Sequence, residues 1–238
     1  VKQDFTKAFE CFEKAAKFNN INALMNLGLL YKNGQGVKQD FVKANECFEK
    51  AAKLGDPESM VNLGNNYLNG QGVKQNFTRA IELYQKAAKL GYSNAFCSLG
   101  FVYLNGQGVK QDHVKAIEFY QNAAKFGNSN AIATLGNFYL NGQGVKQNVQ
   151  KAIEFYEKAV EFGHAGASNN LGNLYYNGKG VKQDFLKAME YYQKAVNFGY
   201  NNALNNIGIL YELGQGVKQD LNKAREYYEK AAKLGCKK

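Results

Sequence analysis

The sequence has no tryptophan, one proline and two histidines in 238 residues. So few histidines argue against a histidine-rich metal site and against catalysis by imidazole, and we expect no enzyme activity, no metal and no cofactor. No uninterrupted apolar run approaches the roughly 18 residues that a membrane-spanning helix requires. The chain also opens on Val1-Lys2-Gln3-Asp4 rather than on an apolar leader. We therefore expect neither a membrane span nor an uncleaved secretory precursor.

Repetition is the strongest feature that the sequence does have. The tripeptide Val-Lys-Gln recurs every 36 residues, without insertion or deletion, at Val1, Val37, Val73, Val109, Val145, Val181 and Val217. Copies of constant length are typical of repeat proteins in which each unit stacks on the next. Because 45% of the residues are hydrophobic, the chain also has enough apolar material for a continuous core. We therefore expect a solenoid.

Each copy contains two stretches with the period of an amphipathic helix. One runs from Asp40, a favoured N-cap residue, to Leu54 and is followed by Gly55; we name this type the B helix. Asp or Asn occupies the N-cap position of every copy, at Asp4, Asp40, Asn76, Asp112, Asn148, Asp184 and Asp220. The other stretch, which we name the A helix, runs from Asn22 to Lys32 and ends in glycine-rich residues that tolerate a left-handed backbone.

The order of these stretches predicts thirteen helices, no strand and one all-α solenoid domain. The expected boundaries are 1–19 for a leading B helix, and then 20–55, 56–91, 92–127, 128–163, 164–199 and 200–238 for six A–B repeats. Gly28 on the A helix should face Ala51 and Ala52 on the B helix, so that the two helices approach closely. Leu27, Phe18 and their counterparts should form a continuous apolar spine.

The recurring residues also carry a family resemblance over the whole chain. In the first complete copy they are Ala23, Leu27-Gly28, Tyr31, Gly34-x-Gly36-Val37, Asp40, Lys43-Ala44, Phe48 and Ala51-Ala52. This pattern resembles the Sel-one-like repeat family, a relative of the tetratricopeptide repeat. The resemblance implies a right-handed α/α superhelix whose A helices line a concave groove. It also implies a non-catalytic scaffold or adaptor, typically bacterial, and it fits the cytoplasm and the periplasm alike.

The candidate partner-binding residues are the A-helix positions that do not serve the expected core and that differ between copies. They are Asn26, Asn62, Asn65, Phe101, Leu104, Asn137, Leu140, Asn170, Asn173, Tyr176 and Asn206. An asparagine amide both donates and accepts, so a row of them could bind the backbone of a peptide segment or of a partner domain. The competing interpretation is that an asparagine-rich chain simply exposes asparagine on solvated helix faces. Protein or peptide, rather than nucleic acid, is the expected partner.

An electrostatic alternative rests on the net charge of +10. Much of the excess comes from the lysine of each Val-Lys-Gln, expected on the loops between A and B helices, at Lys2, Lys38, Lys74, Lys110, Lys146, Lys182 and Lys218. Such a row of lysines attracts anionic surfaces through its long-range electrostatic field. The repetition of the 36-residue unit would, however, produce the same row without any binding function. Other lysines stand four residues after a glutamate on B helices, at Glu10–Lys14, Glu46–Lys50, Glu82–Lys86 and Glu154–Lys158, and are expected to pair.

A third alternative is a weak β-lactamase-like hydrolase, because some cysteine-rich relatives of the family have been linked to that activity. No serine in this chain is followed three residues later by the lysine that would activate it. His113 and His164 each begin a helix without a zinc-binding partner nearby in sequence, and both are expected at the surface. The four cysteines are expected to be free thiols.

The two ends lack the polar caps that solenoids generally need. The chain starts at a B helix without its A partner and stops after Cys236-Lys237-Lys238. We therefore expect exposed apolar faces at both ends, and either a longer parent protein or end-to-end contacts with other chains.

Overall fold

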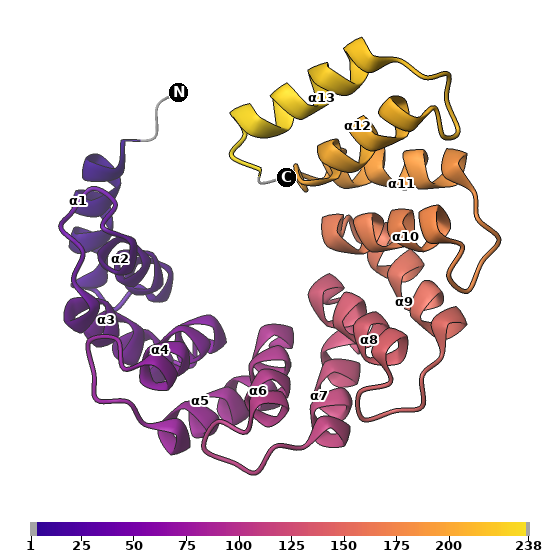
Figure 1. Ribbon diagram of the computed structural model, residues 1–238. Coiled ribbons are helices and arrows are strands. Elements are labelled where there is room, and N and C mark those ends of the chain that lie inside the picture. Colours follow the sequence, from indigo (N-terminus) through magenta and orange to yellow (C-terminus); the bar gives the residue numbers. More distant parts are fainter. Residues whose placement is uncertain (1–3, 237–238) are drawn as a thin grey trace. The chain divides into compact units, whose positions relative to one another are not determined.

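The computed structural model describes residues 4–236, which contain thirteen helices and no strand (Figure 1). The B helices are α1 (Phe5–Ala16), α3 (Phe41–Lys53), α5 (Phe77–Lys89), α7 (His113–Lys125), α9 (Val149–Glu161), α11 (Phe185–Asn197) and α13 (Leu221–Lys233). The A helices are α2 (Ile21–Asn33), α4 (Pro57–Asn69), α6 (Ser93–Asn105), α8 (Ser129–Asn141), α10 (Ala165–Asn177) and α12 (Ala203–Leu213). The predicted all-α solenoid of helix-turn-helix repeats is confirmed.

The chain divides into two compact units, unit 1 (Val1–Phe126) and unit 2 (Gly127–Lys238). Unit 1 contains α1 to α7, and unit 2 contains α8 to α13. Within each unit, every A helix packs against the B helix that follows it, and that B helix packs against the next A helix of the same unit. No helix within residues 4–236 is both long and apolar enough to cross a bilayer.

Local sequence signals set the helix ends as predicted. Each B helix begins after an Asp or Asn whose side chain accepts a hydrogen bond from a backbone N–H of the first turn, which satisfies a donor that the helix itself cannot pair. Asp40, for example, accepts from Val42 N and Lys43 N, both at 3.0 Å. Each A helix ends at a glycine in the left-handed region, such as Gly34 with a φ of 67°.

The glycine of each Leu-Gly pair lets an aromatic ring lie against the A-helix backbone. A Cβ atom placed on Gly28 would lie 2.5 Å from Phe48 Cε1, and one placed on Gly136 would lie 2.6 Å from Tyr156 Cε1. Both rings are fully buried. The expectation that Gly28 faces alanines is therefore wrong, because the space that the glycine leaves is taken by a ring and not by a methyl group.

The apolar spine is narrower than expected. Leu27 is buried, but Phe18 is 86% exposed. The residues at the position of Phe18 in later copies are about half-exposed: Leu54, Leu90, Phe126, Phe162, Phe198 and Leu234. Each of these residues caps the C-terminus of a B helix, where the chain turns toward the next A helix. Their side chains are therefore only partly covered, although Phe126 stacks on Phe96 of α6.

The terminal helices bury little. Helix α1 has no buried residue, and α13 buries only Ala224 and Ala231. Phe5 and Phe12 on α1 are half-buried. The predicted loop lysine Lys2 and the final Lys237-Lys238 lie outside the described residues.

A buried polar pair links two consecutive repeats of unit 1, at positions that are mostly apolar in the other copies. Asn66, which is fully buried, donates from Nδ2 to Asn45 Oδ1 at 2.6 Å, and Asn45 donates to the backbone oxygen of Gln71 at 2.8 Å. The position of Asn45 holds Ile81, Ile117, Ile153 and Met189 in other copies, and that of Asn66 holds Leu30, Val102, Phe138, Leu174 and Leu210. The Oδ1 of Asn66 is buried without a hydrogen-bond partner among the described residues.

Replacing both asparagines should therefore cost less than replacing one. Asn66→Leu leaves the buried Oδ1 of Asn45 without its donor, which should lower the free energy of unfolding by about 1–3 kcal/mol. Asn45→Ile combined with Asn66→Leu removes both groups and should restore most of that loss or exceed it. Urea unfolding of the wild type and the variants measures the difference. A double variant less stable than Asn66→Leu alone would contradict the prediction.

Candidate functional site

The predicted partner-binding residues all lie on A helices and outside the fully buried core. Phe101 and Asn137 are exposed. The others are half-buried: Asn26, Asn62, Asn65, Leu104, Leu140, Asn170, Asn173, Tyr176 and Asn206. Unit 1 holds the positions up to Leu104 and unit 2 the positions from Asn137 onward. In each unit, amides and apolar side chains are thus available on the surface of the A helices.

Three of these asparagines are oriented by a tyrosine of the following B helix. Its hydroxyl donates to the asparagine Oδ1 in the pairs Tyr84–Asn65 (2.7 Å), Tyr156–Asn137 (2.6 Å) and Tyr192–Asn173 (2.8 Å). Burial raises the pKa of Tyr156 to about 12, so its hydroxyl remains a donor at neutral pH. The Nδ2 group of each of the three asparagines has no hydrogen-bond acceptor within the described part of the chain. Each amide therefore keeps two N–H donors for an outside acceptor.

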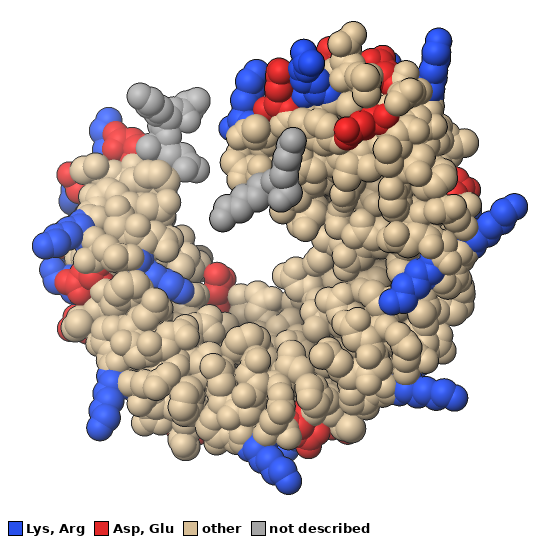
Figure 2. All heavy atoms as spheres, in the orientation of Figure 1, with Lys and Arg blue, Asp and Glu red and all other residues tan. Residues whose placement is uncertain are grey.

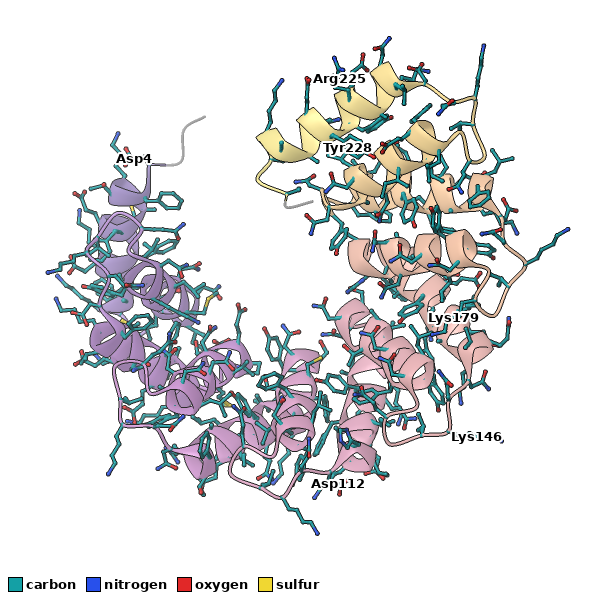
Figure 3. All side chains as sticks on the ribbon, in the orientation of Figure 1. Asp4, Asp112, Lys146, Lys179, Arg225 and Tyr228 are labelled. Carbon is teal, nitrogen blue, oxygen red and sulfur yellow. The ribbon has the colours of Figure 1, made fainter. Side chains whose placement is uncertain are left out.

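The residue types of the two helices carry a signal for this tyrosine–asparagine hydrogen bond, which the predicted row of asparagines did not include. Where the B helix has Phe48 instead of tyrosine, the A-helix position holds Leu29, so that neither partner is polar. The last repeat has Ile209 at the asparagine position, and there Tyr228 donates to Glu212 Oε2 at 2.5 Å (Figure 3). Tyr120, however, has Phe101 at the asparagine position, so the signal covers three of the five repeats that have this tyrosine.

The asparagines directly before Leu-Gly are engaged within the protein. Asn26 donates to Asn22 O at 2.8 Å, and Asn206 donates to Asn169 Oδ1 at 3.0 Å. Asn62 accepts from Lys32 Nζ at 3.3 Å, and burial lowers the pKa of this lysine. The predicted amide row therefore consists of two classes, of which only the class oriented by tyrosine has its donors unused.

The loop lysines lie at the surface, on the connections from A to B helices. The described ones are Lys38, Lys74, Lys110, Lys146, Lys182 and Lys218, and all are exposed. Over most of the face shown in Figure 2, lysine and arginine side chains stand apart from one another rather than forming one patch. Lys146, for example, projects from the loop between α8 and α9 (Figure 3).

Two shallow, open pockets adjoin these loops in consecutive repeats of unit 2. Their volumes are about 650 and 500 Å³. The first is lined by Lys182, Lys187 and Tyr175, with the Lys187 ammonium 5.1 Å from the centre of the Tyr175 ring. The second has Lys218, Lys223 and Tyr211 at the equivalent positions. Each pocket therefore combines two cations and one carboxylate, that of Asp184 or Asp220, with an aromatic ring.

The predicted lysine–glutamate pairs of the B helices do not form salt bridges. Those present within residues 4–236 are Lys7–Asp4 (3.4 Å), Lys53–Glu49 (3.3 Å) and Arg79–Glu82 (3.0 Å). Arg79 thus takes the carboxylate that was expected to pair with Lys86. All of these side chains are substantially exposed, so each pair contributes little to stability.

No group of three His, Cys, Asp or Glu side chains in residues 4–236 could hold a metal ion. All four cysteines are free, and burial raises the pKa of Cys47 and Cys97 to about 11, which disfavours the reactive thiolate. Both histidines are half-buried rather than fully at the surface, and His164 Nδ1 caps α10 by accepting from Ala167 N at 2.9 Å.

The cap at His164 should make stability depend on pH. Burial lowers the pKa of His164, so the unfolded chain takes up a proton more readily than the folded chain. The contribution of the neutral His164 side chain to folding stability is fully present above about pH 6.5, the ordinary pKa of histidine. This contribution is lost as the pH falls from there toward the lowered pKa of the folded state. His164→Asn, which places the N-cap residue of α8 at α10, keeps the acceptor and removes this titration.

Urea unfolding at about pH 7.5 and about pH 5 tests this expectation. The wild type should lose more free energy of unfolding between the two values than His164→Asn does. Equal losses would show that the imidazole is not linked to folding.

Comparison with known proteins identifies relatives over most of the chain. The model of the family described as Sel1 repeat matches residues 1–17, 21–56, 57–92, 97–128, 129–164, 165–197 and 201–236. A Sel1 repeat protein from Oxalobacter formigenes is 36% identical, with a TM-score of 0.83, over 91% of this chain and 89% of that chain. An immunity protein from Pseudomonas aeruginosa is 26% identical, with a TM-score of 0.58, over 81% of this chain and 74% of that one.

A longer relative is a protective antigen present in uropathogenic Escherichia coli strains, which displays an SLR fold. It is 34% identical, with a TM-score of 0.78, and the match covers 99% of this chain but only 50% of the antigen. No curated protein matches the chain closely enough to count as a relative.

Proposed function

Because the chain belongs to the Sel1 repeat family, we propose that it is a non-catalytic scaffold that binds a peptide segment or a partner domain through the exposed surface of its A helices. Sel1 repeat proteins are typically protein-interaction scaffolds without catalytic activity. The repeat fold supports this role, since it presents one A-helix surface per repeat on a rigid frame of paired helices.

The observation that carries the proposal is the set of oriented asparagine amides. In unit 2, Asn137 on α8 and Asn173 on α10 each have Oδ1 held by a tyrosine hydroxyl, and the N–H donors of both remain unused. An amide held in this way loses little side-chain entropy when it binds. Two such donors on consecutive A helices suit the backbone carbonyls of an extended peptide, which every peptide has whatever its side chains.

Apolar groups beside the amides can supply selectivity. Leu140 and Tyr176 follow Asn137 and Asn173 by one helical turn, three residues later on the same helices, and both are half-buried. In unit 1, Leu104 similarly follows the exposed Phe101. A partner that places apolar side chains on these groups while its carbonyls accept from the amides satisfies both kinds of contact.

Changing the two donors into acceptors should weaken binding without affecting the fold. Asn137→Asp with Asn173→Asp keeps the oxygen that accepts from each tyrosine but removes the outward N–H groups. The matched control is Asn76→Asp with Asn148→Asp, which adds the same charge at N-cap positions where other copies already have Asp. The variants are used to capture proteins from a cell extract, and the captured proteins are quantified by mass spectrometry. The amount of each protein that both the wild type and the control retain should be at least tenfold lower on the donor variant. Equal recovery by all three forms would contradict the proposed surface.

A second candidate function is favoured by the paired pockets beside the loop lysines. In each pocket two cations outnumber the one carboxylate and lie beside a ring, which suits an acidic partner. If these pockets bind such a partner, retention of the chain on immobilised heparin should fall steeply with salt, and Lys182→Glu with Lys218→Glu should elute at clearly lower salt. An elution position that these substitutions leave unchanged would remove this candidate.

A further inference from the structure

A pocket lies among α3, α4 and α5 of unit 1, beside a B-helix position at which later copies carry an aromatic ring. In later copies, a B-helix ring stacks on the tyrosine of the preceding A helix, in the pairs Tyr103–Phe119 (5.4 Å between ring centres), Tyr139–Phe155 (5.5 Å), Tyr175–Tyr191 (5.6 Å) and Tyr211–Tyr227 (5.7 Å). The same position of α5 holds Leu83. Leu83 is itself buried and is one of the residues that line the pocket.

The pocket has an apolar floor and a volume of about 100 Å³. The floor is made by Leu83 together with Met60 and Leu63 of α4, each of which is at least nine-tenths buried. This volume is well below the roughly 300–1,000 Å³ of sites that bind small molecules and cofactors. It is suited to a single aliphatic side chain, which is the usual size of an anchor residue at a protein interface.

The rim of the pocket is predominantly cationic. It contains Lys53, Arg79 and Lys86 against the single carboxylate of Glu49. Lys53 pairs with Glu49 at 3.3 Å, and Arg79 pairs with Glu82 at 3.0 Å. Lys86 has no salt bridge within residues 4–236, since Arg79 has taken the nearby Glu82. The pocket therefore has an unpaired cation at its edge, which favours an anionic partner.

We propose that this pocket binds one aliphatic side chain, of about leucine size, that a partner protein presents within an acidic segment. The apolar floor buries the anchor, and Lys86 attracts the flanking carboxylates. The site is formed by two B helices and the inner side of α4, so it is separate from the amide surface of the A helices and does not depend on the function proposed for that surface. It gives unit 1 a second docking point for a partner protein.

The chain allows this site to be tested without guessing the partner, because it contains three methionines, Met25, Met60 and Met189. Met60 lies in the pocket floor, Met25 on the A helix α2, and Met189 on α11 of unit 2. Carbon-13 labelling of the three methyl groups therefore reports on the pocket, on the A-helix surface of unit 1 and on a reference position in unit 2 in one NMR spectrum. The probe is the blocked pentapeptide Asp-Glu-Leu-Glu-Asp at millimolar concentration.

The Met60 signal should shift in a saturable manner while the Met189 signal stays in place. Asp-Glu-Ala-Glu-Asp, which lacks the anchor, and Lys-Lys-Leu-Lys-Lys, which has the opposite charge, should each bind at least fivefold more weakly. Leu83→Phe fills the pocket with the residue that stands at the equivalent position of α7, so it should fold normally and reduce the affinity at least tenfold. Lys86→Asn, which places the residue of the next copy at this position, should keep the pocket and reduce the affinity about threefold.

Three results would overturn the proposal: no shift of Met60, a shift that Leu83→Phe leaves unchanged, or an equal shift with the alanine peptide. A shift confined to Met25 would support the A-helix surface and reject this pocket, so the two proposals fail separately. The urea unfolding midpoint of Leu83→Phe should be at least that of the wild type, because filling a cavity stabilises a protein. With such a midpoint, a loss of binding in this variant reports on the pocket and not on the fold.

Discussion

The contact between an A-helix glycine and a B-helix ring is the constraint on which the rest of each repeat depends. A Cβ atom on Gly64 would lie 2.6 Å from Tyr84 Cε1, and one on Gly172 would lie 2.5 Å from Tyr192 Cε1. Only a residue without a side chain lets a ring of this size lie flat on the helix backbone and become buried. The separation of the paired helices follows from this contact, and so does the direction in which the ring points.

The same contact links the core to the candidate binding surface. A ring that lies across the A-helix backbone carries its hydroxyl to the far side of that helix, where Asn65, Asn137 and Asn173 accept from it. Burial of the ring keeps the hydroxyl protonated, so that it remains a donor, and the asparagine turns its own donors outward. The orientation of the surface amides is therefore a consequence of core packing and not a separate feature of the surface.

In a chain this repetitive, the departures from the repeat carry the most information about function. Asn45 and Asn66 replace apolar residues in two consecutive repeats and form a hydrogen bond between them. Leu83 stands where later copies have a ring, and it lines a pocket with a mostly cationic rim. Each departure is local while the other repeats keep the common packing, because stacked repeats contact only the repeats next to them. Such a fold can therefore acquire a local site at small cost to the whole.

The sequence by itself determined the helices, their order and their ends, because these depend on short-range signals: the period of apolar residues, Asp or Asn at N-caps and glycine at left-handed stops. It also selected A-helix positions that lie outside the fully buried core, since these vary where the core does not. Only the tertiary structure decided which asparagines keep their donors free, that Gly28 meets Phe48 rather than alanine, and that Phe18 lies outside the core. Those outcomes depend on how far a side chain reaches across to another helix, a distance that the spacing of residues within one helix does not specify.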